Sequence, residues 1–339
     1  MLSESCQVCD LGAVKFLFQR SIIPMEIILG IDQLKRALRN PVVTLGNFDG
    51  VHLGHQKIFN RAKEEASKLG GEAVVITFEP HPLKVLAPRH CPPLLTPFRK
   101  KMILIEESGM DVVLCIEFTL AFSKTSPLDF VKNVLVEKVG ARKIIVGYNY
   151  HFGKAKEGNV EALKNMGKLF NMAVEVVQPM KVGDSVVSSS RVRELIKTGK
   201  VEEASTLLGR SYLMVGKVVA GAGRGHALGF PTANLEISDE LHPQPGVYAV
   251  EVIWNHRSFH GVANVGRNPT FETEGLNKIN LEAYLLDFDQ QIYGEEIQVN
   301  FQRRIRDEVR FDSRDQLIAQ IKKDVKWAQE NLFNVRKLS

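Results

Sequence analysis

Two histidines lie where a strand-like run gives way to a helical pattern, in the stretch VVTLGNFDGVHLGHQKIF at residues 42–59. His52 and His55 form H-L-G-H. The first amides of a helix lack intrahelical partners and its dipole favours anions. Two imidazoles there could donate to phosphate oxygens and stabilise the charge that develops on a leaving pyrophosphate. Capping or packing is the alternative, but H-x-G-H at a strand–turn–helix junction favours the phosphate role. Glycines, which let backbone approach a phosphate, punctuate the stretch: Gly46, Gly50 and Gly54.

The composition predicts a soluble chain with more than one domain. A length of 339 residues exceeds what one hydrophobic core usually serves. The 44 basic residues exceed the 39 acidic ones only slightly, which suits small anionic ligands and does not indicate nucleic acid. No apolar run reaches membrane-spanning length. The four cysteines are expected to be free thiols in a reducing cytoplasm.

Strand-like and helical patterns alternate through the first half of the chain. The strand-like runs are VVTL (42–45), AVVITF (73–78), VVLCIEF (112–118), KIIVG (143–147) and AVEVV (173–177). Runs without polar alternation are typical of parallel strands covered on both faces. The alternation predicts a Rossmann-like, doubly wound α/β domain that binds ligands at the carboxyl ends of its strands.

The pattern changes after residue 200. Short strand-like runs separated by turn signals predict an antiparallel barrel or sandwich, and a final helix follows with an apolar stripe that begins at Leu317. We place the domain boundary near Leu208. The expected organisation is an extension over residues 1–24 that is dispensable, an α/β domain over residues 25–208 and a small β domain over residues 209–339.

Several segments resemble, in the same order, those of prokaryotic bifunctional riboflavin kinase/FAD synthetases, from about Met25 to the C-terminus. They are GNFDGVHLGH (46–55), TFEPHP (77–82), VGYNYHFGKAKEGN (146–159), SSSRVR (188–193), GAGRGHALGFPTANL (221–235), NVGRNPTF (264–271) and LEAYLLDFD (281–289). The resemblance implies an H-x-G-H nucleotidylyltransferase domain followed by a riboflavin kinase barrel with a C-terminal helix.

In the first domain, the resemblance implies catalytic roles for His52 and His55. Asn149 would contact both nucleotide and flavin. The other nucleotide-binding positions would be Gly46, Phe48, Asp49, Gly50, Gly54, Ser189, Ser190 and Arg193.

In the second domain, the resemblance implies that Glu282 is the general base for the riboflavin 5′-hydroxyl. Thr232 and Asn234 would hold Mg²⁺ and the nucleotide phosphates. The remaining nucleotide-binding positions would be Gly223, Arg224 and Gly225, and the flavin-binding ones Asn264, Pro269 and Thr270. The simpler alternatives are an outward-facing carboxylate for Glu282 and turn chemistry for Thr232 and Asn234. Because no Walker A motif occurs, a kinase here is not a P-loop enzyme.

The chain also departs from the family's pattern. His151, Ala155 and Lys156 stand where other residues are more usual, and Tyr284 replaces a common histidine beside the proposed base. These differences concern loop contacts and pH dependence. The arginines within residues 301–311 are expected to form a solvated face.

The resemblance implies a two-step enzyme that phosphorylates riboflavin with MgATP to FMN and then transfers AMP from ATP to FMN, giving FAD and pyrophosphate. Riboflavin, FMN and ATP would be its partners, without nucleic acid or membrane, and self-association stays open. Two alternatives remain: an H-x-G-H nucleotidylyltransferase of another acceptor, and a non-catalytic flavin-sensing regulator. The runs GFPTAN and LEAYLLDF argue against the first, and the intact histidines and Glu282 against the second.

Overall fold

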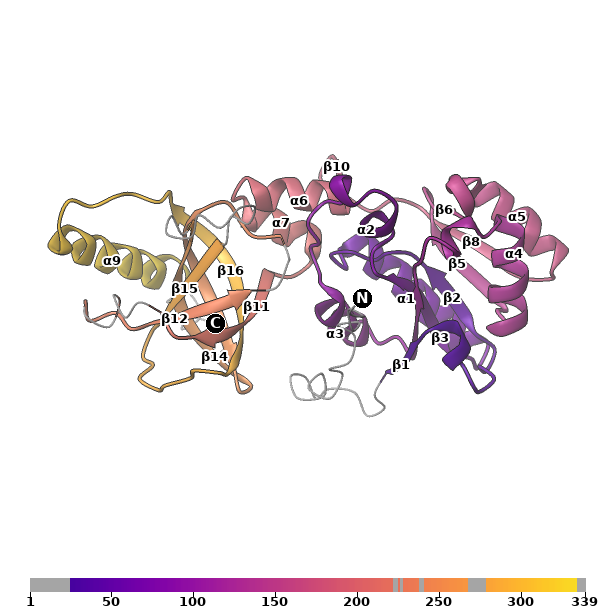
Figure 1. Cartoon of the computed structure of the whole chain (residues 1–339), viewed down its shortest axis with the longest axis horizontal. Helices are drawn as coiled ribbons and strands as arrows, with labels where there is room; N and C mark the ends of the chain where they lie inside the picture. The colour runs from indigo at the N-terminus through magenta and orange to yellow at the C-terminus, as the bar shows by residue number, and fades with distance from the viewer. Residues whose placement is uncertain (1–24, 222–224, 226–227, 238–240, 268–278, 334–339) are drawn as a thin grey trace, which may run out of the picture. The chain divides into compact units, whose positions relative to one another are not determined.

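The chain forms two compact units, of which the first ends at Ser189 and the second begins at Ser190. The computed structural model (Figure 1) describes residues 25–221, 225, 228–237, 241–267 and 279–333. Helices α6 (Ser189–Lys197) and α7 (Val201–Leu208) group with the second unit. The predicted division of the activities at residue 208 stays a prediction.

The first unit is built on one wholly parallel sheet, which confirms the predicted α/β domain. The strand order is β1-β4-β3-β2-β5-β8. The bounds are β1 (Glu26–Leu29), β2 (Val42–Leu45), β3 (Ala73–Glu79), β4 (Val112–Glu117), β5 (Lys143–Gly147) and β8 (Ala173–Val177). From β2 the chain proceeds to β3 and β4 on one side and then crosses to β5 on the other. The carboxyl end of β2 is therefore a topological switch point, where such sheets bind ligands.

Helices cover both faces of this sheet. Helices α1 (Leu53–Lys68) and α3 (Phe98–Glu107) bury apolar side chains such as Phe59 and Ile105 against one face. A π-helix (Phe130–Lys138) and α5 (Val160–Leu169) cover the other, with Leu135 and Leu163 fully buried. This cover explains why the strands lack polar alternation.

Shorter elements connect these layers. The helices are α2 (Pro82–Leu86) and α4 (Pro127–Asp129), with 3₁₀ turns at Ile31–Gln33, Pro88–His90, Phe122–Lys124 and Lys154–Lys156. Two small antiparallel pairs join β6 (His151–Phe152) to β7 (Gly158–Asn159) and β9 (Lys181–Val182) to β10 (Ser185–Val186).

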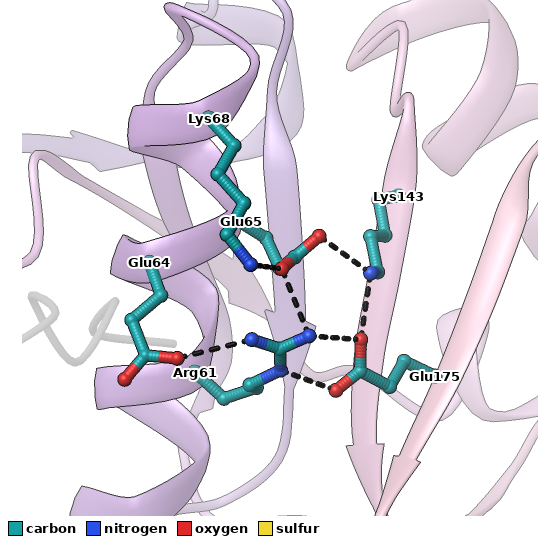
Figure 2. A network of polar contacts seen from close by, with 6 residues as sticks. All are labelled: Arg61, Glu64, Glu65, Lys68, Lys143 and Glu175. Carbon is teal, nitrogen blue, oxygen red and sulfur yellow. Dashed lines mark hydrogen bonds and ion pairs between the residues drawn. The ribbon is translucent and has the colours of Figure 1, made fainter.

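A network of charged side chains fastens the middle of α1 to the neighbouring strands β5 and β8. Figure 2 shows Arg61 and Glu65 of α1 facing Lys143 and Glu175. The Lys143 ammonium lies 2.7 Å from Glu65 and 2.6 Å from Glu175. This network fixes the middle of α1, beyond the helix start that the histidine-bearing turn leads into.

The second unit is a closed six-stranded antiparallel barrel, which decides between the predicted barrel and sandwich. Its strands follow the order β11-β12-β15-β14-β13-β16. Their bounds are β11 (Tyr212–Val219), β12 (Thr232–Ile237), β13 (Gly246–Trp254), β14 (Arg257–Arg267), β15 (Ile279–Leu285) and β16 (Glu296–Arg306). Helix α9 (Arg314–Ala328) and a π-turn (Gln329–Phe333) follow, and Ala328 packs on Val247 and Val262 of the barrel.

Candidate functional sites

The turn between β2 and α1, residues 46–52, has a backbone that few sequences could adopt. Phe48, Gly50 and Val51 all have positive φ values, of 50°, 90° and 39°. A Cβ on Gly50 would lie 2.7 Å from the Leu95 side chain, so glycine is required there by conformation and by space. The β2–α1 turn thus brings its backbone to the switch point in a fixed shape.

The two predicted histidines stack on each other at the start of α1. Their ring centroids are 3.7 Å apart with an interplanar angle of 18°. The Nδ1 atom of His52 accepts the His55 backbone N–H at 3.3 Å, so a neutral His52 carries its proton on Nε2. A Cβ on Gly54 would come within 3.1 Å of the His52 ring. The capping interpretation is confirmed for His52, and the phosphate role of both rings stays a prediction.

Asp49 does not present its carboxylate outward. The side chain is buried and accepts three hydrogen bonds, from Thr96 N at 2.9 Å, Thr96 Oγ1 at 3.0 Å and Leu95 N at 3.2 Å. Gly50 N in turn donates to Thr96 Oγ1 at 2.9 Å. These bonds tie the β2–α1 turn to residues 95–96, so Asp49 can serve nucleotide binding by holding the turn in place.

The other residues predicted to bind nucleotide in adenylyl transfer lie in three places. Ser189 Oγ donates to the Asp49 carbonyl at 2.8 Å, which brings the chain after β10 to the β2–α1 turn. Asn149 is exposed in the loop after β5, with its carbonyl 2.9 Å from His151 Nδ1. Ser190 and Arg193 lie on α6 in the second unit. Their roles toward nucleotide stay predictions.

The second unit contains a cavity of about 450 Å³ that is lined by four of the five predicted kinase residues in the described part of the chain, the exception being Asn234. Gly225, Thr232, Asn264 and Glu282 all line it, and so does Tyr284. These residues come from β12, β14 and β15 and from the segment before β12. One cavity therefore unites residues from three strands and a connecting segment that are distant in the sequence.

Strand register explains how Glu282 meets its neighbours. Glu282 lies opposite Asn234 of β12 on one side and opposite Asn264 of β14 on the other. Asn280 Nδ2 donates to Glu282 Oε1 at 2.6 Å, which orients the carboxylate. Glu282 therefore lies in a cavity, rather than on an open face as its simpler alternative required. A Cβ on Gly221 would come within 2.2 Å of the Asn234 amide, so that amide packs tightly against the backbone at the start of the same motif.

One wall of this cavity comes from residues that the sequence analysis did not assign to a site. Arg306 and Asp324 form a bidentate pair with N–O distances of 2.8 to 3.0 Å, and Asp324 is buried. Gln320 donates to the same carboxylate at 2.8 Å. The expectation of a solvated arginine face is wrong for Arg306, because its side chain lines the cavity and fastens α9 to the barrel end. Other lining residues from this part are Glu308, Val309, Phe311, Leu317 and Ile321.

Four predicted site residues lie outside the described residues: Gly223, Arg224, Pro269 and Thr270. The two predicted Mg²⁺ ligands, Thr232 and Asn234, carry neutral oxygens on one face of β12. Within the described ranges, no group of three or more histidine, cysteine, aspartate or glutamate side chains could hold a metal ion. Two neutral oxygens fit Mg²⁺ that arrives with the phosphates of ATP, because Mg²⁺ usually keeps waters and takes few protein ligands.

Comparison with known proteins identifies both units. A family model described as FAD synthetase matches residues 34–191, and one described as riboflavin kinase matches residues 208–332. The bifunctional riboflavin kinase/FMN adenylyltransferase of Buchnera aphidicola is 35% identical over 92% of this chain and 100% of the relative. That of Listeria monocytogenes is 38% identical over 84% of this chain and 90% of the relative. The chain belongs to the bifunctional riboflavin kinase/FMN adenylyltransferase family.

Membership of this family decides among the alternatives. The chain has riboflavin kinase and FMN adenylyltransferase activities and serves FAD biosynthesis. A nucleotidylyltransferase of another acceptor and a non-catalytic regulator are thereby set aside.

A solved structure from Streptococcus pneumoniae, described as a macrolide-efflux protein, is 32% identical. It has a TM-score of 0.82 over 91% of this chain and 99% of that one. In the described part of the chain, no helix has the length and apolar character that crossing a membrane requires. The likeness to this structure supports the fold, and the efflux role that its name suggests is not carried over to this chain.

Proposed function

We propose that riboflavin phosphorylation takes place in the barrel cavity with Glu282 as its general base. The supporting observation is the position of this carboxylate, inside a cavity of about 450 Å³ that it shares with Thr232 and Asn264. Glu282 accepts the proton of the riboflavin 5′-hydroxyl as that oxygen attacks the γ-phosphorus of ATP and ADP leaves. A positioned base of this kind contributes roughly 10²–10⁴-fold to the rate.

In this proposal, β12 provides the nucleotide end of the cavity. Thr232 and Asn234 would hold Mg²⁺ together with the ATP phosphates, and the ion would supply charge neutralisation to the phosphoryl group. Asn264, opposite Glu282 on β14, orients the flavin side. Apolar lining residues such as Val262 and Ile321 exclude water around the flavin ring. Positioning and electrostatics thus carry the chemistry, without a covalent intermediate.

We propose that adenylyl transfer takes place at the β2–α1 turn of the first unit. A phosphate oxygen of FMN attacks the α-phosphorus of ATP, and the bond to pyrophosphate breaks. His52 and His55 donate to the oxygens on which charge develops, together with the amides at the start of α1. The stacked rings of His52 and His55, and the hydrogen bonds that hold the turn in place, support this role. Electrostatic stabilisation needs donors that are in place before the reaction.

Two variants separate the two sites. His55→Ala removes a donor whose loss is expected to lower FMN adenylylation about 10²–10³-fold, so that FMN accumulates from riboflavin. Glu282→Gln keeps the shape of the kinase site but cannot accept the hydroxyl proton, so FMN formation should collapse while FMN supplied directly still becomes FAD. Both products are measured chromatographically on proteins whose fold is checked by circular dichroism.

The two variants also serve as controls for each other. If His55→Ala slowed riboflavin phosphorylation as severely as FAD synthesis, or if Glu282→Gln left FMN formation intact, the assigned division of labour would be wrong.

A further inference from the structure

Lys101 is a buried lysine that none of the sequence motifs includes. It lies in α3, and its side chain is 7% exposed. Its ammonium has three donors but reaches its acceptors only at long distances, 3.3 Å to Thr77 Oγ1 and 3.5 Å to the Phe78 carbonyl. The Glu79 carboxylate is 3.9 Å away. A buried charge with such incomplete compensation is not an efficient way to stabilise a fold.

A second lysine of the same unit shows what efficient compensation looks like. Lys143 lies 2.6 and 2.7 Å from two carboxylates, those of Glu175 and Glu65. Its geometry is that of a structural ion pair. Lys101 has the opposite geometry, because it is more deeply buried and less well bonded.

The contacts of Lys101 lead to the β2–α1 turn. Thr77 lies near the carboxyl end of β3, accepts from Lys101, and donates its hydroxyl to the Asn47 carbonyl at 3.4 Å. The Asn47 side chain lies 3.3 Å from His81 Nε2. The turn is therefore held at Asp49 by residues 95–96, which precede α3, and at Asn47 through Thr77 by α3 itself.

The ammonium is also a buried positive charge that interacts with Asp49 of the β2–α1 turn, the turn proposed to bind the anionic phosphates. Charges interact more strongly through a protein interior than through water. The anionic or titratable groups that face it are Glu79 from β3, Cys115 from β4 and Asp49 from the turn. Burial raises the pKa of the Cys115 thiol to about 12, so this thiol stays neutral.

We propose that Lys101 is a positioning residue of the adenylyltransferase site, which holds the Asn47 end of the β2–α1 turn through Thr77 and supplies a buried positive charge that interacts with it. This inference rests on the proposed role of the turn in adenylyl transfer. With this positive charge in place, the site should bind MgATP and pyrophosphate more tightly. Riboflavin phosphorylation, in the other unit, does not depend on it.

The test compares Lys101→Met with Lys143→Met in the full chain. For Lys101→Met we expect kcat/KM for MgATP in FMN adenylylation to fall about 10²-fold, the loss expected from a displacement of about 1 Å at a reacting group. Inhibition by added pyrophosphate should weaken, and riboflavin phosphorylation should stay within twofold of wild type. Lys143→Met should lower the unfolding temperature and leave the kinetics of both reactions unchanged. Unchanged adenylylation in Lys101→Met, or an equal fall in both activities, would overturn the proposal.

Lys101→Arg keeps the test decisive if the methionine variant does not fold. Burial lowers the pKa of Lys101, so wild-type adenylylation should decline at a pH below the ordinary lysine pKa of about 10.4 as the ammonium loses its proton. A guanidinium keeps its charge, so the alkaline decline should move to higher pH in Lys101→Arg. An identical alkaline profile in both proteins would sink the inference. Unchanged FAD synthesis in His55→Ala would instead contradict the proposed place of adenylyl transfer.

Discussion

The two sites of this chain are built in opposite ways. The β2–α1 turn is one short segment, and it is held in a strained shape by hydrogen bonds that Asp49 and the Asn47 carbonyl accept and that Gly50 N donates. The barrel cavity is assembled from separate strands, and the last helix, α9, forms one of its walls. The residues of the first site lie on one short segment that distant residues hold in shape, whereas the second site is assembled from distant parts of the chain.

This difference has a consequence for the chemistry. Adenylyl transfer needs donors fixed around a compact pyrophosphate, which a rigid turn at a helix start provides. Riboflavin is a larger, partly apolar substrate, which needs a cavity with apolar walls and a few polar groups. A wall such as α9, which the Arg306–Asp324 ion pair and apolar contacts hold against the barrel, can be weakened without unfolding the barrel.

The comparison predicts the largest loss of activity when the Asp49 carboxylate, which ties the β2–α1 turn to residues 95–96, is removed. Asp49→Ala removes the three bonds that residues 95–96 make to the Asp49 carboxylate. The positive-φ residues of the turn then lose their main support, and we expect kcat/KM for FMN adenylylation to fall roughly a hundredfold. Riboflavin phosphorylation by the same protein should be unchanged. Both rates are measured on one preparation.

Asp111→Ala is the matched control for this prediction. Asp111 also accepts a backbone bond, from Ala73 N at 2.8 Å, but at the amino end of the sheet. Its loss should lower stability and spare the adenylylation kinetics. An equal kinetic loss in both variants would mean that Asp49 matters only to folding.

The same contrast explains what could be predicted from the sequence. The β2–α1 turn was predictable because H-x-G-H and its glycines lie within ten residues and their chemistry follows from the start of a helix. The strands of the sheet were predictable because burial on both faces leaves uninterrupted apolar runs. The buried roles of Asp49 and Lys101 were not, since both depend on residues that only the folded sheet brings near.

In the second unit, the position of Glu282 was available only through resemblance. An isolated glutamate on an apolar strand does not reveal which side faces a cavity. β12 was not predicted as a strand, since its Thr232 and Asn234 follow a proline and look like turn residues. Arg306 and Asp324 are 18 positions apart, and nothing in their local sequence shows that they pair. The side that Glu282 faces, the strand β12 and the Arg306–Asp324 pair all depend on how the strands and α9 come together in the folded unit.

A moderate effect is expected where the assembled cavity is weakest. Asp324→Asn keeps the shape of the side chain but removes the charge opposite Arg306. Hydrogen bonds to charged groups contribute about 1.5–3 kcal/mol, and part of this loss should appear as a less well-held α9. We expect the KM for riboflavin to rise about tenfold, with a smaller change in the KM for MgATP.

FMN adenylylation by the Asp324→Asn protein provides the control for its fold. Asp315→Asn, at the exposed start of the same helix, should change neither reaction. If Asp324→Asn raised the two KM values equally, α9 would not act as the flavin wall and the contrast between the two sites would weaken.

The smallest effect is expected at the network of Figure 2, which supports α1 away from either site. Hydrogen bonds from Lys143 and Lys68 lower the pKa of Glu65 to about 2. A carboxyl group with a lowered folded pKa adds stability above its unfolded pKa, near 4.3, and loses that contribution as the pH falls toward the folded value. Glu65→Gln should therefore lower the unfolding temperature slightly at pH 7, and the difference from wild type should shrink as the pH is lowered from about 5. Thermal unfolding followed by circular dichroism measures both, while the two activities at pH 7 should not change.

A difference in unfolding temperature that stayed constant down to pH 3 would show that Glu65 acts through packing rather than charge. A selective fall in FMN adenylylation would show that support of α1 reaches the β2–α1 turn after all.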